Sequence, residues 1–386
     1  MASNEQPASS ADTIVTDVRN LYRHLIGDGF ADLERMPATV ISEVPKGSVR
    51  RYEPITQEDP DALPTLIIPP MAATAASFDL RRGCSLVEYL LEQGRPVYLV
   101  DYGEVSMLSD SDLGLEHWID VVVPHAVKTV SEDAGGKPVQ LVGWCLGGVL
   151  SLFTHAAHPE LPIASVATVA SPFDFGAVKL LAPVRVLESM TRGTLTTALV
   201  RVLGGIPSKA NEVIFSWLTP SKQVKKPIKL LQHRSDPEIL AQIQAVDAVM
   251  GSMEAYPGRS IAQIYHAFVR TNHLANGTIR LEGGRILRLS EVTIPVMNIA
   301  GQDDLMFAPP ASAYRLGELL PNAPHVRLET APGGHLGVLT GTRARETTWR
   351  YLEEFLTGVD ALDGGESASD PDVDLSGAEV VQEETP

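Results

Sequence analysis

The feature that most constrains the fold of this chain is the stretch at residues 139–150, VQLVGWCLGGVL. It predicts a short buried strand that runs into a helix through Gly-Trp-Cys-Leu-Gly-Gly. This stretch matches the pattern of a nucleophile elbow, in which the nucleophile is separated from a glycine on each side by one residue of any type. In such an elbow a tight turn lifts one side chain clear of a sheet. The flanking glycines let the strand and the helix approach closely. The lifted residue here is Cys145, where most such turns carry serine.

Strands and helices alternate on both sides of this stretch, as they do in a parallel sheet. Helical periodicity is present at residues 86–94, 112–130, 146–155 and 343–356. Short apolar runs that predict strands lie between these helices, at residues 66–71, 96–100, 139–142, 163–170, 294–300 and 325–330. The pattern predicts an α/β fold with a mostly parallel central sheet flanked by helices.

The alternation breaks down between residues 172 and 290, where helical patterns are interrupted by prolines. A block of this kind between two sheet strands predicts an inserted helical cap over the strand ends. We therefore expect a core of residues 48–171 and 291–358 with a cap at 172–290. Residues 1–47 are expected to hold a disordered start and one helix at 12–26, and the acidic residues 359–386 a disordered tail.

Charge and cysteine content limit which partners and which cellular compartment we expect for this chain. The formal net charge is -17, and no basic cluster accompanies the motif-bearing stretches, so nucleic acid is not an expected partner. The lysine-rich stretch at 222–229 is interpreted as a solvated face, with an anionic coenzyme A as the alternative. The two cysteines, Cys84 and Cys145, are expected to be reduced. No secretory leader or run of about 18 apolar residues stands out, which predicts a cytoplasmic protein with at most peripheral contact to a lipid or polymer surface.

Three polar residues follow successive predicted strands in the order nucleophile, acid, histidine, which is the order of an α/β-hydrolase triad. Cys145 is the nucleophile, Asp304 the acid and His335, in the stretch PGGHLG, the histidine. A cysteine attacks as its thiolate, which a helix N-terminus and a nearby imidazole stabilise. His335 would take the thiol proton and later activate the incoming hydroxyl or water, and the aspartate would fix the imidazole tautomer.

The acid of the triad has an alternative in the sequence, and the oxyanion hole is inferred from position alone. We prefer Asp304 because residues 301–304, GQDD, give the spacing usual in this loop, and Asp303 is the alternative acid. The backbone N–H groups of Leu146 and Met71 are the predicted oxyanion hole, because such donors follow the nucleophile and the earlier strand. No metal site is predicted, since the histidine pairs in the sequence lack a supporting carboxylate or cysteine cluster.

Several stretches resemble the polyhydroxyalkanoate synthase family, and especially its short members that work with a second subunit. The resemblance is carried by GWCLGG at 143–148, SLVEYLLEQGRPVYLVDYG at 85–103, FSWLTP at 215–220, TNHLANGTIRLEGGRILRLSEVTIPVMNIAGQDD at 271–304 and GGHLGVLTG at 333–341. It covers about residues 65–356. It implies an α/β-hydrolase core with a cap and Cys145, Asp304 and His335 as the triad.

The resemblance also implies an activity, which is transfer of a 3-hydroxyacyl group from coenzyme A thioester to the cysteine and then to a hydroxyl acceptor. Acyl-coenzyme A would be the substrate, with no permanently bound cofactor, and a second subunit, a homo-oligomer or a polymer granule are the implied partners. The chain departs from the family at Tyr102, where the family has tryptophan, and at Leu305, where many members have histidine. A thioesterase or esterase with the same triad and a non-catalytic, granule-associated relative are the alternative functions.

Overall fold

The computed structural model describes residues 29–105, 109–179 and 235–364, with isolated positions at 20, 205–206, 209 and 232–233. The predicted helix at 12–26, the FSWLTP stretch, the lysine-rich stretch and the predicted tail from residue 365 onward lie outside the described residues, apart from Asn20.

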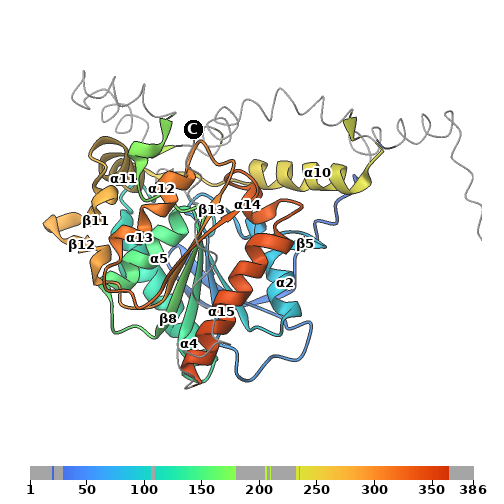
Figure 1. The fold of residues 1–386 in the computed structure, drawn as a ribbon, viewed down its shortest axis with the longest axis horizontal. Helices are drawn as coiled ribbons and strands as arrows, with labels where there is room; N and C mark the ends of the chain where they lie inside the picture. Colours follow the sequence, from blue (N-terminus) through green and yellow to red (C-terminus); the bar gives the residue numbers. More distant parts are fainter. Residues whose placement is uncertain are drawn as a thin grey trace, which may run out of the picture.

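An eight-stranded sheet forms the centre of the molecule (Figure 1). Neighbouring strands are parallel from β6 to β14, and β1 and β2 add an antiparallel hairpin beside β6. In spatial order the strands are β1 (Ala38–Val44), β2 (Gly47–Tyr52), β6 (Val97–Asp101), β3 (Thr65–Ile68), β7 (Val139–Trp144), β8 (Ile163–Val169), β13 (Val296–Gly301) and β14 (Val326–Ala331). The predicted α/β-hydrolase architecture, a mostly parallel sheet flanked by helices, is confirmed.

Helices cover both faces of the sheet, because the parallel strands are apolar on both sides. Leu66 and Leu141 join one core cluster with residues of α4 (Val123–Asp133) and α5 (Leu146–Ala157). Ile67 and Val142, which point the other way, join a second cluster with α2 (Leu86–Glu92) and α15 (Arg350–Asp363). The remaining short elements include β4 (Asp79–Arg81), β5 (Cys84–Ser85), α3 (Leu115–His117), η2 (Trp118–Val122), α12 (Pro310–Tyr314), α13 (Leu316–Leu319), α14 (Gly337–Thr340) and η9 (Arg345–Trp349).

The predicted start of the core at residue 48 is wrong, because β1 belongs to the sheet. This edge strand pairs with β2 from Ala38 opposite Tyr52 to Val44 opposite Gly47. None of its residues is fully buried, so the sequence ATVISEV has no buried apolar run that would mark a strand.

The predicted end of the core at residue 358 is also wrong, because α15 continues to Asp363. Val359 is buried in the core, and the Asp360 carboxylate accepts hydrogen bonds from the Leu63 amide at 2.9 Å and from Gln140 Nε2 at 2.7 Å. The acidic composition of this segment suggested disorder, but one of its acids is paired inside the fold.

The described part of the predicted cap has two locations in the fold. Helix α10 (Pro237–Gly251) buries Ala245 and Val249 with Ala73 and Ala76, which follow β3, and so lies at the carboxyl ends of the strands (Figure 1). The chain continues through β10 (Tyr256–Pro257), α11 (Gly258–Ile264), η5 (Tyr265–Arg270) and η6 (His273–Asn276). The hairpin of β11 (Thr278–Arg280) and β12 (Ile286–Arg288) instead packs beside α5, since Leu287 shares a core cluster with Phe153.

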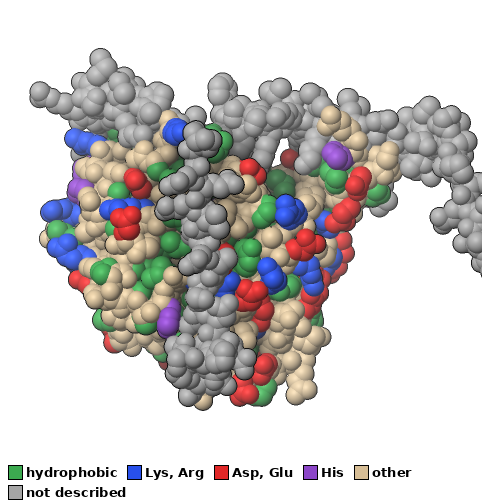
Figure 2. All heavy atoms as spheres, in the orientation of Figure 1, with side chains coloured by type: hydrophobic (Ala, Val, Ile, Leu, Met, Phe, Trp, Pro, Cys, Tyr) green, Lys and Arg blue, Asp and Glu red, His purple; other side chains and the backbone are tan. Residues whose placement is uncertain are grey.

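Acidic and basic side chains are interspersed on the face shown in Figure 2. Ion pairs such as Arg345 with Glu92, at 2.5 Å, and Arg350 with Glu354, at 3.6 Å, link neighbouring side chains near α2 and α15. The described part of this face therefore presents mixed charge. Among the described helices, none is both long and apolar enough to cross a bilayer.

Candidate active site

Cys145 occupies the turn between β7 and α5 in a conformation that few side chains adopt. Its backbone has φ 53° and ψ -121°, a positive φ that is uncommon and costly for a residue other than glycine. Two hydrogen bonds hold the turn: the Cys145 amide donates to the Val169 carbonyl at 2.8 Å, and Ser171 Oγ donates to the Cys145 carbonyl at 2.7 Å. The predicted nucleophile elbow is thus present in geometry as well as in sequence.

The glycines of the elbow allow close contact between α5 and the sheet. A side chain at Gly147 would collide with the carbonyl oxygen of Ile68, the last residue of β3. A side chain at Gly143 would collide with the backbone of Gly148. The first turn of α5 therefore packs directly against the end of β3, which carries the predicted oxyanion loop.

Asp304, and not Asp303, contacts the histidine. Nδ1 of His335 lies 2.7 Å from Oδ2 of Asp304, which is buried, whereas Asp303 is exposed. The Asp304 carboxylate also accepts three backbone hydrogen bonds, from Met306 at 3.2 Å, Phe307 at 3.1 Å and Ala308 at 3.1 Å. These donors fix its position and balance its negative charge.

The electrostatics favour a charged histidine beside a charged aspartate. Burial opposes the imidazolium, but the Cys145 sulfur, which hydrogen-bonds the ring, and Asp304 together raise the pKa of His335 to about 10. Burial likewise opposes the carboxylate, but the hydrogen bond and charge of His335 and the backbone amides lower the pKa of Asp304. Since Nδ1 faces Asp304, Nε2 is the nitrogen available to the sulfur.

Two aromatic residues that the sequence did not single out hold the His335 ring. The Trp144 ring centroid lies 5.4 Å from the imidazole centroid, and Trp144 Nε1 donates to the His335 carbonyl at 3.1 Å. The Phe307 ring lies against the imidazole at 4.6 Å between centroids. Trp144 directly precedes Cys145, so its place in the elbow motif was a signal in the sequence. Phe307 had no such signal beyond following Asp304 by three residues.

The amides predicted for the oxyanion hole belong to α5 and to the loop after β3. Leu146 is the first residue of α5, and the first amides of a helix lack a carbonyl partner within the helix. Met71 is buried in the loop that follows β3. Tyr102, at the end of β6, holds this loop by donating from its hydroxyl to the Pro69 carbonyl at 2.9 Å.

The inserted segment contacts the same loop. The Glu254 amide donates to the Ala72 carbonyl at 2.9 Å, and the hydroxyls of Ser252 and Thr74 lie 3.1 Å apart. Two residues further on, burial and the nearby Cys145 sulfur raise the pKa of the Tyr256 hydroxyl. No local pattern marks Tyr256, because its closeness to Cys145 is a tertiary feature.

The described residues hold no group of three His, Cys, Asp or Glu side chains that would bind a metal ion. Cys84 is buried and far along the chain from the elbow; burial raises the pKa of its thiol, which favours the unreactive protonated form. Both cysteines are free thiols in the structure.

Comparison with known proteins identifies the relatives of this chain. The α/β-hydrolase fold model matches residues 71–342. The poly(3-hydroxyalkanoate) polymerase subunit PhaC of Allochromatium vinosum is 26% identical over 87% of this chain and 94% of its own length. The subunit of the same name from Thiocystis violacea is also 26% identical, over 87% and 94%, and that from Haloferax mediterranei is 26% identical over 86% and 67%. The chain therefore belongs to the α/β-hydrolase fold family and, within it, is an enzyme of the polyhydroxyalkanoate synthase family.

Proposed function

We propose that this enzyme transfers a 3-hydroxyacyl group from a coenzyme A thioester to Cys145 and from there to a hydroxyl acceptor, extending a polyester. The observation that carries the proposal is a cysteine, in place of serine, at a strained elbow, with its sulfur hydrogen-bonded to a histidine that Asp304 holds by Nδ1. Exchange of one thioester for another changes little in energy, so the acyl-enzyme keeps its reactivity for an alcohol.

In the first half-reaction the Cys145 thiolate attacks the thioester carbonyl carbon, and the carbonyl electron pair moves onto oxygen. The N–H groups of Leu146 and Met71 would bind that oxygen. The carbon–sulfur bond to coenzyme A then breaks, and the leaving thiolate takes the proton from Nε2 of His335. The products are the acyl-enzyme and free coenzyme A.

In the second half-reaction Nε2 of His335 takes the proton of the acceptor hydroxyl while its oxygen attacks the acyl carbon. The Cys145 thiolate leaves, and the thiolate and imidazolium are restored. Asp304 stays ionised throughout and stabilises the imidazolium each time it forms. No resident cofactor is part of this proposal, and acyl-coenzyme A enters only as substrate.

The proposal is tested by incubating the purified chain with 3-hydroxybutyryl-coenzyme A while thiol release and polymer are both measured. We expect thiol release with polymer, and an acyl adduct at Cys145 by mass spectrometry that is missing in Cys145→Ala. Cys84→Ala is the matched control and should retain both. Free acid without polymer would identify a thioesterase instead, and neither release nor adduct, with or without an added partner subunit, would identify a non-catalytic relative.

The partners and compartment follow from the same chemistry. A chain that consumes coenzyme A thioesters works where those thioesters are made, so we propose a cytoplasmic enzyme at the surface of the polymer it extends. A second subunit or a homo-oligomer is part of this proposal. Light scattering of the chain, alone and with substrate, measures directly whether it forms a homo-oligomer.

A further inference from the structure

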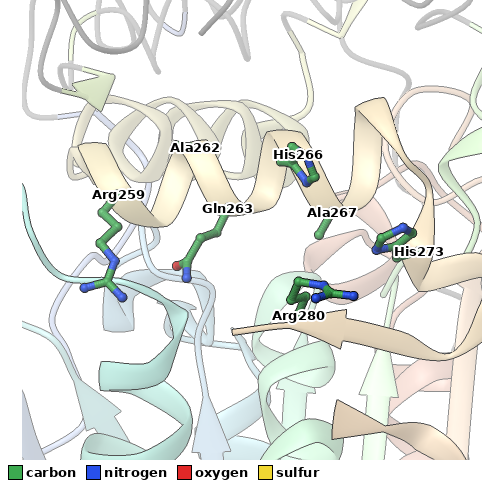
Figure 3. A pocket seen from close by; sticks show the side chains of 7 residues that line it. All are labelled: Arg259, Ala262, Gln263, His266, Ala267, His273 and Arg280. Carbon is green, nitrogen blue, oxygen red and sulfur yellow. The ribbon is translucent and has the colours of Figure 1, made fainter. Parts of the chain in front are cut away.

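A cavity apart from the triad lies between the inserted helices and the β11–β12 hairpin (Figure 3). Its volume is about 240 Å³, and α11, η5, η6 and β11 all contribute to its wall. Arg259 and Gln263 point into it from α11, His266 and Ala267 lie on η5, and His273 and Arg280 approach from η6 and β11 (Figure 3). No acidic residue lines it.

The two ends of this cavity differ in charge balance. At one end the Arg259 guanidinium is paired with Glu116 at 3.2 Å and with Glu282 at 2.6 Å, and Gln263 donates to Glu116 at 2.8 Å. At the other end Arg280 forms no ion pair with any described residue. The positive charge of the cavity is therefore uncompensated at the Arg280 end.

Two histidines, His266 and His273, line that end of the cavity. Burial, then the positive charges of Arg270 and His273, lower the pKa of His266. The neutral form of the His266 ring is therefore favoured, and an anion bound beside it would favour the imidazolium instead. Arg280 and His266 are exposed, so an anion can reach this end of the cavity from solvent.

We propose that this cavity binds a phosphate group between Arg280, His266 and His273. A guanidinium presents paired N–H donors that match two phosphate oxygens, and imidazole nitrogens supply further donors. Pockets for drug-sized ligands measure roughly 300–1,000 Å³, so a smaller cavity suits a single tetrahedral anion or the phosphate end of a larger ligand. The proposal does not depend on the chemistry at Cys145.

The test follows the histidine ring signals of the full-length protein by NMR, with inorganic phosphate as the probe and sodium chloride at equal ionic strength as the reference. We expect phosphate to raise the measured pKa of His266 by about 0.5 or more at saturation. Arg280→Gln should abolish this rise. Arg288→Gln, an exposed arginine on the neighbouring strand β12, is the matched control and should leave it unchanged.

A second arm distinguishes the source of the phosphate. Adenosine 3′,5′-bisphosphate, which carries the phosphates of the nucleotide part of coenzyme A, is titrated in the same way. Binding at least tenfold tighter than inorganic phosphate, and lost in Arg280→Gln, would identify the end of a larger ligand; equal binding would identify free phosphate. No rise in the pKa of His266, or an equal rise with chloride or in Arg280→Gln, would overturn the site. Repeating the titration with Cys145→Ala separates this result from the failure of acyl transfer.

Discussion

Asp304 lies 2.7 Å from Nδ1 of His335 and is buried, whereas its neighbour Asp303 is exposed and its amide donates to the Gly333 carbonyl. Substitutions of the two aspartates should therefore have different effects on turnover. Asp304→Asn should lower kcat by about 10³- to 10⁴-fold, because an amide at this place cannot fix the imidazole tautomer or stabilise the imidazolium. Asp303→Asn should stay within about twofold of wild type. Steady-state thiol release measures both, and a larger loss in Asp303→Asn would contradict the assignment.

The His335 imidazolium should keep Cys145 reactive at neutral pH. Since the pKa of His335 is raised to about 10, the protonated ring persists through neutral pH and is lost only as the pH rises through that value. We expect iodoacetamide at pH 7 to alkylate Cys145 selectively over Cys84. His335→Gln should slow this labelling by at least about tenfold. Peptide mass spectrometry gives the rate at each cysteine, and equal slow labelling of the two in wild type would refute an activated thiol.

Tyr102 should affect turnover through the oxyanion loop. Tyr102→Phe leaves the Pro69 carbonyl without its donor and frees the loop that carries Met71. We expect kcat to fall by about tenfold with a smaller change in KM, and stability to fall by about 1–3 kcal/mol. Tyr98→Phe is the control, because Tyr98 lies on the same strand, β6, and its hydroxyl donates to Asp133 at the end of α4 at 2.7 Å, away from the loop that carries Met71. It should lose stability and keep kcat; an equal loss of kcat in both variants would show that the Tyr102 effect is not local.

His155 should make the fold sensitive to acid. Burial lowers the pKa of this histidine, and its Nδ1 has no hydrogen-bond partner among the described residues. The unfolded chain, with a pKa of about 6.5, binds a proton more readily than the folded one. Stability is therefore complete above about pH 6.5 and falls as the pH drops below it. Urea unfolding at pH 7 and pH 5 should show a smaller loss for His155→Leu than for wild type, and equal losses would argue against this source.

Asp360 should be as important as a core residue, although it lies in a segment whose composition predicted disorder. Its carboxylate pairs with the buried Arg95 at 2.7 Å. Asp360→Ala removes one of the two acids that pair with this guanidinium, and we expect a loss of about 3 kcal/mol in the free energy of unfolding. Asp363→Ala, at the exposed end of the same helix, should change it by less than about 0.5 kcal/mol. The midpoints of denaturant unfolding measure both changes in stability. Similar losses in the two variants would show that Glu353 alone is a sufficient partner for Arg95.

The sheet and the order of Cys145, Asp304 and His335 along it could be predicted, because both follow from local sequence patterns. Apolar runs mark the buried strands, and the elbow and the Gly-Gly-His stretch each lie at a strand end. β1 could not be predicted in this way, since its side chains are half-exposed or exposed and the strand is recognised only by its pairing with β2. The end of α15 was missed for a similar reason, because the partners of Asp360 lie far away in the sequence.

The surroundings of the site depend on tertiary contacts more than its chemical groups do. Trp144 and Phe307 contact the His335 ring only because β7 and β13 lead into one place. Tyr256 comes from an insertion whose path no local pattern encodes. The choice between Asp303 and Asp304 was open in the sequence, and it depends on which of two adjacent side chains points inward.

The hydrogen bond from the Glu254 amide to the Ala72 carbonyl has a mechanical consequence. It joins the segment that carries Tyr256, whose hydroxyl lies near the Cys145 sulfur, to the loop that carries Met71. Any displacement of this segment from the loop must break this bond, and the loop then loses one of its supports. The position of the inserted segment and the support of the predicted oxyanion loop are therefore coupled through one hydrogen bond.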